Sequence, residues 1–305
     1  MSFNFANIAV NDLTGRITKT EHIANGQTGE VWKGTYTVGD REDIVAVKAM
    51  RSTLFKRSED AEKTIRRLSR EMKVWSTCVH PHLALFIGIC YETIQGYRVP
   101  CLISPFYKNG TIMQYLEHNS NAVPMDLFRQ FFSGLAYLHG RDEAVVHGDL
   151  KPANILIDDA GNAVLADFGH SRILGISGFT TKTWTVAGTG RYMAPELMIP
   201  EDDETKPIPT TASDVWAAGM TGLQILSGKI PYVEFKTDSE LAKAIADNKL
   251  PNKAHYDPLV PSGAWTAFVK CWERNPRERP PVQRLSDYFD KNYGPDSTRP
   301  TRTRG

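Results

Sequence analysis

The sequence predicts an α+β protein in which a small β-rich part precedes a larger, mainly α-helical part. Two β-branched runs lie in the first hundred residues, at 31–37 and 43–50, and a further short apolar run follows at 98–105. After Asn109 and Gly110 the apolar residues recur at helical spacing instead. A chain of 305 residues is long enough for both parts to bury a core of their own.

One segment of the β-rich part has a helical period. Between 58 and 77, the residues Leu68, Met72 and Trp75 recur at spacings of three and four, and basic residues occupy the other faces. This pattern predicts a single amphipathic helix among the strands.

The second part is expected to begin with a long helix and a hairpin. Apolar residues between 127 and 138 form a wide stripe that ends at Gly140. A hairpin over 155–166 follows, and residues 167–196, which have no sustained period, predict a long functional loop. From Asp214 onward the pattern is helical again.

Composition and charge exclude several classes of protein. The chain has 36 Lys and Arg against 35 Asp and Glu, a net charge of +1, so it lacks the electrostatic footprint of a nucleic-acid or anionic-membrane binder. No apolar run is long enough to span a bilayer, and residues 1–12 lack the features of a secretory signal. Four cysteines without a CxxC pair predict free thiols in a reducing compartment. We therefore expect a soluble, cytoplasmic protein.

Polar residues at the centre of the chain predict a site for a hard cation. Asp149 and Asn154 follow the long helix, and Asp167 follows the predicted hairpin. A hairpin that leaves after Asn154 and returns before Asp167 would bring these two oxygen ligands side by side, an arrangement that suits Mg²⁺ bound to phosphates. Asp149 lies outside that pair, so it is available to accept a hydroxyl proton.

These motifs resemble those of the eukaryotic protein kinases, in the order and spacing of that family. The matching positions are Ala46-Val47-Lys48, Glu71, the segment 147–154, Asp167-Phe168-Gly169, Ala194-Pro195-Glu196, Asp214 and Arg279. The resemblance covers residues 17–293 and implies the bilobal kinase fold. It places an N-lobe at 17–104, with a small antiparallel sheet and one helix, a hinge at 105–109 and a mainly α-helical C-lobe at 110–293. Residues 1–16 are then an N-terminal extension and residues 294–305 a flexible tail.

The resemblance implies an ATP site in the first part of the chain. The glycine-rich loop falls on 24–29, with Ala24 in place of its first glycine, and the hinge falls beside Ser104 at the gatekeeper position. The ATP-binding residues that it implies are Ala24, Asn25, Gly26, Gln27, Thr28, Gly29, Val31, Ala46, Lys48, Ser104, Pro105, Tyr107 and Leu156. The small Ser104 side chain predicts a back pocket that bulky inhibitors can enter.

The remaining site residues are also implied by the resemblance. Lys48 reaches the phosphates and pairs with Glu71 in the active state, since a lysine in an apolar strand needs a partner. Asn154 and Asp167 are the metal ligands, and Asp149 orients the substrate hydroxyl. Supporting roles fall to His147 and Phe168 in the spine, to Glu196 and Arg279 as a buried salt bridge, and to Asp214 as an anchor.

Two features bear on the substrate class. Lys151 and Thr189 match the catalytic pattern of the serine/threonine kinases, in which the lysine neutralises charge on the transferred phosphoryl group. Cys271-Trp272, with Pro276 and Arg279, resembles the tyrosine-kinase and tyrosine-kinase-like branch. Together they imply a tyrosine-kinase-like serine/threonine kinase that uses Mg-ATP and a protein substrate.

One departure from the family concerns regulation. Gly148 replaces the arginine that normally receives an activation-loop phosphate. We therefore expect activity to depend weakly on phosphorylation of the loop, with Arg172 as the one basic residue near that pocket. An alternative reading is a pseudokinase that binds nucleotide as a scaffold, and it is disfavoured because Lys48, Asp149 and Asp167 are all present. A small-molecule phosphotransferase is disfavoured by the segment around Thr189, and the sequence leaves the oligomeric state open.

Overall fold

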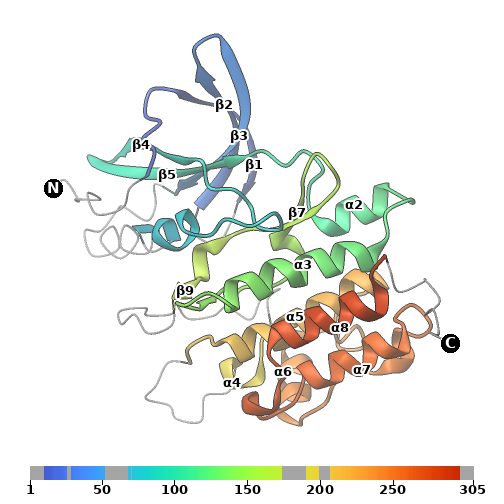
Figure 1. Ribbon diagram of the computed structural model, residues 1–305. Coiled ribbons are helices and arrows are strands. Elements are labelled where there is room, and N and C mark those ends of the chain that lie inside the picture. The colour runs from blue at the N-terminus through green and yellow to red at the C-terminus, as the bar shows by residue number, and fades with distance from the viewer. Residues whose placement is uncertain are drawn as a thin grey trace. The chain divides into compact units, whose positions relative to one another are not determined.

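The computed structural model describes residues 10–25, 29–51, 68–69, 71–173, 190–198 and 207–295. The chain divides into two compact units, Met1–Lys108 and Asn109–Gly305, which we describe separately. The first unit contains a β-sheet with one helical segment and the second is mainly helical (Figure 1). The α+β class and the two-part division predicted from the sequence are confirmed.

The sheet of the first unit has five antiparallel strands in the order β1-β2-β3-β5-β4. These strands are β1 (Ile17–Asn25), β2 (Gly29–Val38), β3 (Arg41–Met50), β4 (Gly88–Ile94) and β5 (Tyr97–Pro105). The connection between β4 and β5 is the tight turn of Gln95 and Gly96, both with positive φ (49° and 81°). Such a turn matches the twist of the paired strands and fixes their register.

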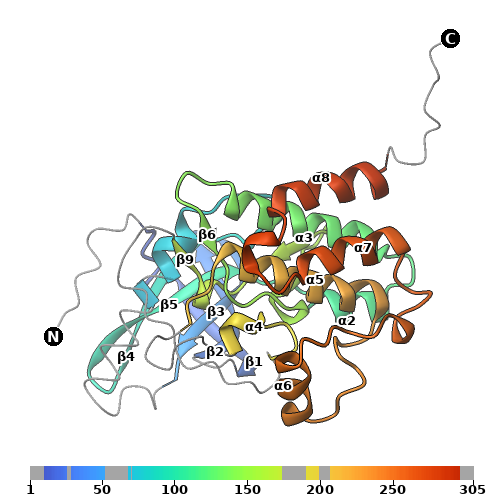
Figure 2. The same ribbon diagram turned by 90° about the horizontal axis from the view of Figure 1, so that it is seen from below.

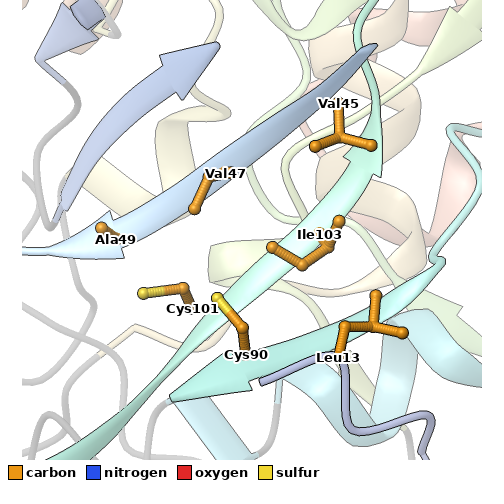
Figure 3. Close-up of a cluster of buried hydrophobic side chains, with 7 residues drawn as sticks. All are labelled: Leu13, Val45, Val47, Ala49, Cys90, Cys101 and Ile103. Carbon is orange, nitrogen blue, oxygen red and sulfur yellow. The ribbon is translucent and has the colours of Figure 1, made fainter. Parts of the chain in front are cut away.

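Alternation along β3 gives the sheet two chemically different faces. Val45, Val47 and Ala49 are buried and belong to an apolar cluster (Figure 3). Ala46 and Lys48 alternate with them along the strand and therefore lie on the opposite face. The cluster also contains Leu13, Cys90, Cys101 and Ile103. The sheet is therefore packed on one face and presents Lys48 on the other.

The helical residues 68–69 and 71–76 belong to the segment for which the sequence predicts a helix. Leu68, Met72 and Trp75 are buried, as the helical spacing predicts. The indole N–H of Trp75 donates to the carbonyl of Ala84 (2.6 Å), and the Trp75 ring lies 5.3 Å from that of Phe86. These contacts attach the helix to the segment that leads into β4.

Residues 11–14 add to the outer edge of the sheet. Asp12 pairs with Ile89 in a parallel bridge, and backbone bonds join Leu13 N to Ile89 O (2.7 Å) and Ile89 N to Asn11 O (2.9 Å). The Leu13 side chain is buried in the apolar cluster. This short segment therefore covers the exposed side of β4, which would otherwise present unpaired backbone groups.

The second unit is built from helices that pack around α3. Its helices are α2 (Ile112–His118), α3 (Pro124–His139), α4 (Pro195–Met198), α5 (Thr211–Ser227), α6 (Asp238–Ala246), α7 (Ser262–Cys271) and α8 (Val282–Tyr293). The buried face of α3 carries Phe128, Phe131 and Phe132, and the Phe128 ring stacks edge-on against Phe289 of α8. In both views α3 runs alongside α8 (Figures 1 and 2).

Two short antiparallel pairs hold the segments that carry the polar motifs. β6 (Val145–Val146) pairs with β9 (Arg172–Ile173), and β7 (Ile155–Ile157) pairs with β8 (Ala163–Leu165). The second pair is the hairpin predicted from the sequence. The segment 147–154 therefore lies between β6 and β7, and Asp167 follows β8. Among the residues described, no helix is both long and apolar enough to cross a membrane.

Candidate active site

Lys48 and Glu71 form a buried ion pair in the first unit. The distance from Lys48 Nζ to Glu71 Oε1 is 2.6 Å, and the Glu71 side chain is only 2% exposed. A carboxylate that is this deeply buried requires a charged partner. The pair connects β3 to the helical residues 71–76, so the strand and the helix jointly fix the position of the ammonium group.

The strand register places the implied nucleotide-binding residues together with Lys48. Val31 lies directly opposite Lys48 in the β2–β3 ladder, and Ala24 lies opposite Val31 in the β1–β2 ladder. Asn25 ends β1 and Gly29 begins β2. A Cβ atom at Gly29 would lie 2.4 Å from the carbonyl oxygen of Ala49, so this position has no room for a side chain. Gly26, Gln27 and Thr28 lie outside the described residues.

The residues predicted to form the gatekeeper and the hinge lie at the end of β5 and directly after it. Ser104 lies opposite Ala46 and Pro105 lies opposite Val45 in the β3–β5 ladder, so Ser104 and Ala46 share a face. Tyr107 accepts a hydrogen bond through its hydroxyl from the amide of Leu85 (3.1 Å). The Ser104 side chain is small, and its hydroxyl bonds locally to the carbonyl of Pro105 (3.4 Å).

In the second unit, Asp214 of α5 anchors the segment 147–154. Its carboxylate accepts the amides of His147 (2.7 Å) and Gly148 (2.9 Å), and it is 1% exposed. The imidazole Nε2 of His139, at the end of α3, lies 2.9 Å from the same carboxylate. Three groups thus converge on one buried carboxylate and fix the backbone that leads to Asp149.

Asp149 is held by its neighbours in a defined orientation. Its Oδ2 atom accepts from Lys151 Nζ (2.8 Å) and from Asn154 Nδ2 (3.0 Å). His170 Nδ1 lies 3.7 Å from the same oxygen, an ion-pair distance rather than that of a hydrogen bond. These contacts are all on one side of the carboxylate, so Oδ1 is the oxygen available to an incoming hydroxyl.

The surroundings of Asp149 keep it ionised. Burial by itself raises the pKa of this carboxyl, but the neighbouring His170 and the charge of Lys151 outweigh burial and lower the pKa to about 2. Asp149 is therefore an anion throughout the neutral range, as a group that accepts a hydrogen bond from a hydroxyl must be.

Asn154 and Asp167 lie at the open end of the β7–β8 hairpin, where Ala166 N donates to Asn154 O (2.8 Å). Both amide hydrogens of Asn154 point to Asp149, to its carbonyl (2.7 Å) and to its carboxylate, which directs the Asn154 side-chain oxygen elsewhere as an acceptor. Asp167 adopts a left-handed conformation (φ 65°). An amide oxygen and a carboxylate are donors that suit a divalent cation with phosphate ligands. Leu156 lies in β7 and pairs with Thr111.

His147 is a packed, neutral residue. Its Nε2 bonds to the carbonyl of Ala166 (3.0 Å), its Nδ1 accepts from the amide of Asp149 (3.3 Å), and burial lowers its pKa. The ring lies 5.6 Å from that of Phe168. The imidazole therefore connects the segment 147–154 to the end of the hairpin and is not placed to act as a base.

Gly148 occupies a position that favours glycine. Its φ is +80°, and a Cβ atom there would lie 2.9 Å from the carbonyl oxygen of His170. Ser171, which follows His170, donates a hydrogen bond from its hydroxyl to the carbonyl of His147 (3.1 Å). The start of the segment after Asp167 is thus bonded directly to the segment 147–154.

Glu196 and Arg279 form a two-pronged ion pair in the second unit. Arg279 donates to the two carboxylate oxygens of Glu196 at 2.7 and 2.8 Å, and its guanidinium stacks on Trp216. Arg279 also binds the carbonyl of Ala212 (2.9 Å), at the start of α5. This pair attaches α4 to the start of α5 and to the segment that carries Arg279. Thr189 lies outside the described residues.

Two residues near Asp149 and Asp214 were absent from the predicted site. His139 contacts the Asp214 carboxylate, and His170 lies beside Asp149. The signal for His139 is a polar residue at the end of an otherwise apolar helical stripe, and the signal for His170 is its place directly after the Asp-Phe-Gly triplet. Neither pattern identifies the contact. Asp214 is 75 residues away from His139 in the sequence, and the position of His170 beside Asp149 depends on the turn that follows Asp167.

Comparison with known proteins agrees with this geometry. The family model described as "Protein kinase domain" matches residues 17–289. Serine/threonine-protein kinase 12 of Arabidopsis thaliana is 27% identical over 265 residues, which are 85% of this chain and 54% of that protein. Mitogen-activated protein kinase kinase kinase 5 of the same plant is 30% identical over 283 residues, which are 90% of this chain and 37% of that protein.

A third relative, serine/threonine-protein kinase STY46 of Arabidopsis thaliana, is 28% identical over 277 residues, 88% of this chain and 43% of its own length. The chain therefore spans about half or less of the length of these curated relatives. The family model, in contrast, matches most of the chain, including every motif described above. The chain belongs to the protein kinase domain family.

Proposed function

We propose that this chain is a protein serine/threonine kinase, which transfers the γ-phosphoryl group of ATP to a serine or threonine hydroxyl of a protein. The observation that carries the proposal is the arrangement around Asp149, which Lys151 and Asn154 hold at 2.8 and 3.0 Å. The three relatives named above are kinases of which two are described as serine/threonine-protein kinases. Lys151, two residues after Asp149, supports that substrate class.

The reaction needs one group that orients the nucleophile. Asp149 accepts a hydrogen bond from the substrate hydroxyl through Oδ1, since its other oxygen is occupied. The hydroxyl oxygen attacks the γ-phosphorus, the bond to the departing ADP oxygen breaks, and the hydroxyl proton passes to Asp149. The low pKa of Asp149 fits orientation of the hydroxyl more than early removal of its proton.

Other residues stabilise the charge of the phosphates. We propose that Lys48, fixed by Glu71, binds the α- and β-phosphates, and that Lys151 neutralises charge on the transferred group. Asn154 and Asp167 would hold a divalent cation, which we propose is Mg²⁺ and which would offset the negative charge of the phosphates. The adenine-facing surface falls to Ala24, Val31, Ala46, Leu156 and the backbone near Ser104, Pro105 and Tyr107.

We propose a contact surface for the protein substrate beside Asp149. A small hollow is lined by Asp149, Met193 and Leu197 together with neighbouring residues of the same unit. Its walls combine the catalytic segment with the residues just before α4. We propose that the substrate backbone passes here, with its hydroxyl at Asp149.

We also propose a cytoplasmic location. All four cysteines are free thiols in the structure, as is typical of proteins in a reducing compartment. The assignment to the tyrosine-kinase-like branch remains a proposal that is based on Cys271, Trp272 and Arg279.

A phosphorylation assay with Asp149→Asn as its control tests the function. The chain is incubated with Mg-ATP and a generic protein substrate, and phosphoamino acids are separated. Phosphoserine or phosphothreonine that disappears with Asp149→Asn supports the proposal. Phosphotyrosine alone would contradict the substrate class, and incorporation unaffected by the variant would indicate a contaminant. Nucleotide binding without any turnover would favour the pseudokinase alternative.

A further inference from the structure

Two cysteines face each other across neighbouring strands of the first unit. Cys90 of β4 and Cys101 of β5 are direct partners in the antiparallel ladder. Their side chains lie side by side on the face of the sheet that carries Val45, Val47 and Ile103 (Figure 3). This face is opposite to the one that presents Lys48, so the two thiols are not part of the proposed phosphoryl-transfer site.

The turn between the strands determines the distance between the two cysteines. Gln95 and Gly96 form a two-residue turn, so the closing pair Ile94 and Tyr97 is hydrogen-bonded, and every second pair before it is as well. Cys90 and Cys101 are such a pair. Pro100, which lacks an N–H, falls on the alternate, non-hydrogen-bonded position, as this count requires.

A hydrogen-bonded antiparallel pair has its Cα atoms about 5.5 Å apart. Disulfides span Cα distances of about 4.4 to 6.8 Å and most often about 5.5 to 6 Å. The Cα separation of this pair therefore lies within the disulfide range. The Cβ atoms of a hydrogen-bonded pair are about 5.5 Å apart, so they must approach each other by about 1 Å for the disulfide to form. Cys78 and Cys271 are also buried, but neither has a cysteine as its strand partner.

The two thiols differ in their surroundings, which gives each a separate role. Cys90 is 7% exposed and Cys101 is completely buried. The thiol of Cys101 donates to the sulfur of Cys90, which lowers the pKa of Cys90, and the same bond together with burial raises the pKa of Cys101. Burial and the nearby Glu92 carboxylate oppose this lowering of the pKa of Cys90, and Lys19, the ion-pair partner of Glu92, offsets only part of the effect of Glu92.

We propose that Cys90 and Cys101 are a modification site: a dithiol that a small neutral peroxide oxidises to a cross-strand disulfide. The sulfur of Cys90 attacks one oxygen of hydrogen peroxide and the O–O bond breaks. One water is released, and Cys90 becomes a sulfenic acid. The sulfur of Cys101 then attacks that of Cys90, and a second water leaves as the S–S bond forms. Two thiols lose two electrons and two protons, and one peroxide becomes two waters.

The site suits an oxidant of this class because of its burial. Hydrogen peroxide is uncharged and close to water in size, whereas larger or charged thiol reagents would not reach Cys90 between the packed strands. A disulfide formed in this way is reversible by thiol exchange, as is typical of regulatory disulfides in a reducing compartment. The inference is independent of the proposed kinase activity, since its readout is the covalent state of the thiols.

Peptide mapping of the full-length chain tests the proposal. Arg98 lies between the two cysteines, so trypsin separates Cys90, in peptide 74–98, from Cys101, in peptide 99–108. The folded chain is treated with hydrogen peroxide, remaining thiols are alkylated, and the digest is analysed by mass spectrometry. We expect peptides 74–98 and 99–108 to be joined, with the loss of two hydrogens, and to separate after treatment with dithiothreitol.

Variants make the outcome specific. Cys78→Ser removes the second cysteine of peptide 74–98 and should leave the cross-link intact. Cys101→Ser should stop the reaction at a sulfenic acid on Cys90, which dimedone traps when the peroxide-treated chain is unfolded in denaturant, and thermal unfolding checks that this variant is folded. Cys271 is buried, its pKa is raised to about 12 by burial, and it serves as an internal control that must stay a thiol.

Peroxide is kept below the concentration at which Cys271 is modified. Under that condition, Cys90 and Cys101 recovered as alkylated thiols would overturn the proposal. Sulfinic acid on Cys90 without a cross-link in the unsubstituted chain would overturn it as well, because Cys101 would then not be the resolving thiol.

Discussion

The 2.6 Å ion pair between Lys48 and Glu71 joins the central strand of the first unit to its helix. The lysine is thereby fixed at the end of an apolar strand, with its ammonium group on the face opposite the buried cluster. Any change that separates the two residues displaces the charge that we assign to the phosphates of ATP.

Replacement of Lys48 is expected to abolish most of the activity. Lys48→Met should lower kcat/KM at least about 100-fold, which corresponds to about 2.7 kcal/mol of transition-state stabilisation. Glu71→Gln, which keeps the shape but removes the charge, should cost about tenfold. Lys73→Met, on the exposed face of the same helix, is the matched control and should retain activity. Equal losses for Lys73→Met and Lys48→Met would show that the effect is structural.

The low pKa of Asp149 predicts a contribution to stability in acid. The folded pKa is lowered from 3.8 to about 2, so the ionised group stabilises the fold above pH 4, and this contribution is lost as the pH falls through 2. The shift corresponds to about 2 kcal/mol. The free energy of unfolding, measured for the wild type and for Asp149→Asn from pH 6 to pH 2, should show a larger decrease in the wild type. Parallel curves would contradict the assigned pKa.

The backbone conformation of Gly148 predicts that any other residue type at this position would destabilise the fold. Gly148→Ala should destabilise the fold by about 1 to 2 kcal/mol, because φ is +80° and the new Cβ would lie close to the carbonyl of His170. Gly39→Ala is the control, since Gly39 has φ +60° but open space around it. Chemical denaturation should show a greater loss for Gly148→Ala, and similar losses would remove the argument from the His170 contact.

The same position predicts weak dependence on phosphorylation. Without an arginine at 148, a phosphate on residues 171–185 has fewer cationic partners. Phosphatase treatment is expected to change kinase activity less than tenfold, a difference of about 1.4 kcal/mol in the barrier. A larger loss after treatment would show that another cationic group receives the phosphate.

The Glu196–Arg279 pair is expected to stabilise the second unit. Arg279→Met leaves the Glu196 carboxylate without its two hydrogen bonds and should lower the free energy of unfolding by about 3 kcal/mol. Arg279→Lys restores the charge but not the two-pronged geometry, so it should recover only part of the loss. Thermal and chemical unfolding measure both. Full recovery with lysine would mean that charge alone is sufficient.

Ser104 predicts the pattern of inhibition. Its small side chain lies opposite Ala46 on the face shared with Lys48. Ser104→Met should weaken the binding of ATP-competitive inhibitors with bulky substituents by tenfold or more and leave compact inhibitors largely unaffected, about 1.4 kcal/mol of selectivity. Inhibition constants for a matched bulky and compact pair provide the measurement. A uniform change for both would place Ser104 away from the inhibitor pocket.

The predicted parts of the fold were those with a strong apolar pattern. Runs at 31–37, 43–50 and 98–105 correspond to β2, β3 and β5, and the stripe over 127–138 corresponds to α3. β1 gave no such signal, because its side chains are mostly exposed and polar along Ile17–Asn25. Periodicity detects burial, so a solvent-facing edge strand escapes it.

β4 was missed for the opposite reason. Gly88–Ile94 continues an apolar run that begins before the strand, and short apolar runs do not distinguish a strand from other buried segments. In the site, spacing predicted Asn154 and Asp167 at the ends of one hairpin because the hairpin is local. His139 and Asp214 are 75 residues apart, and only the packing of α3 against α5 brings them together.

The docking of residues 11–14 on β4 separates two boundaries that are often treated as one. The family match begins at residue 17, yet the sheet has already gained a strand-like segment and a core side chain, Leu13, before that point. The family match and the folded sheet therefore begin at different residues of this chain. A chain that began at residue 17 would keep every motif described above but would lose the Leu13 side chain from the apolar cluster. The edge strand β4 would then have unpaired backbone groups at Ile89, which could pair with a strand of another molecule.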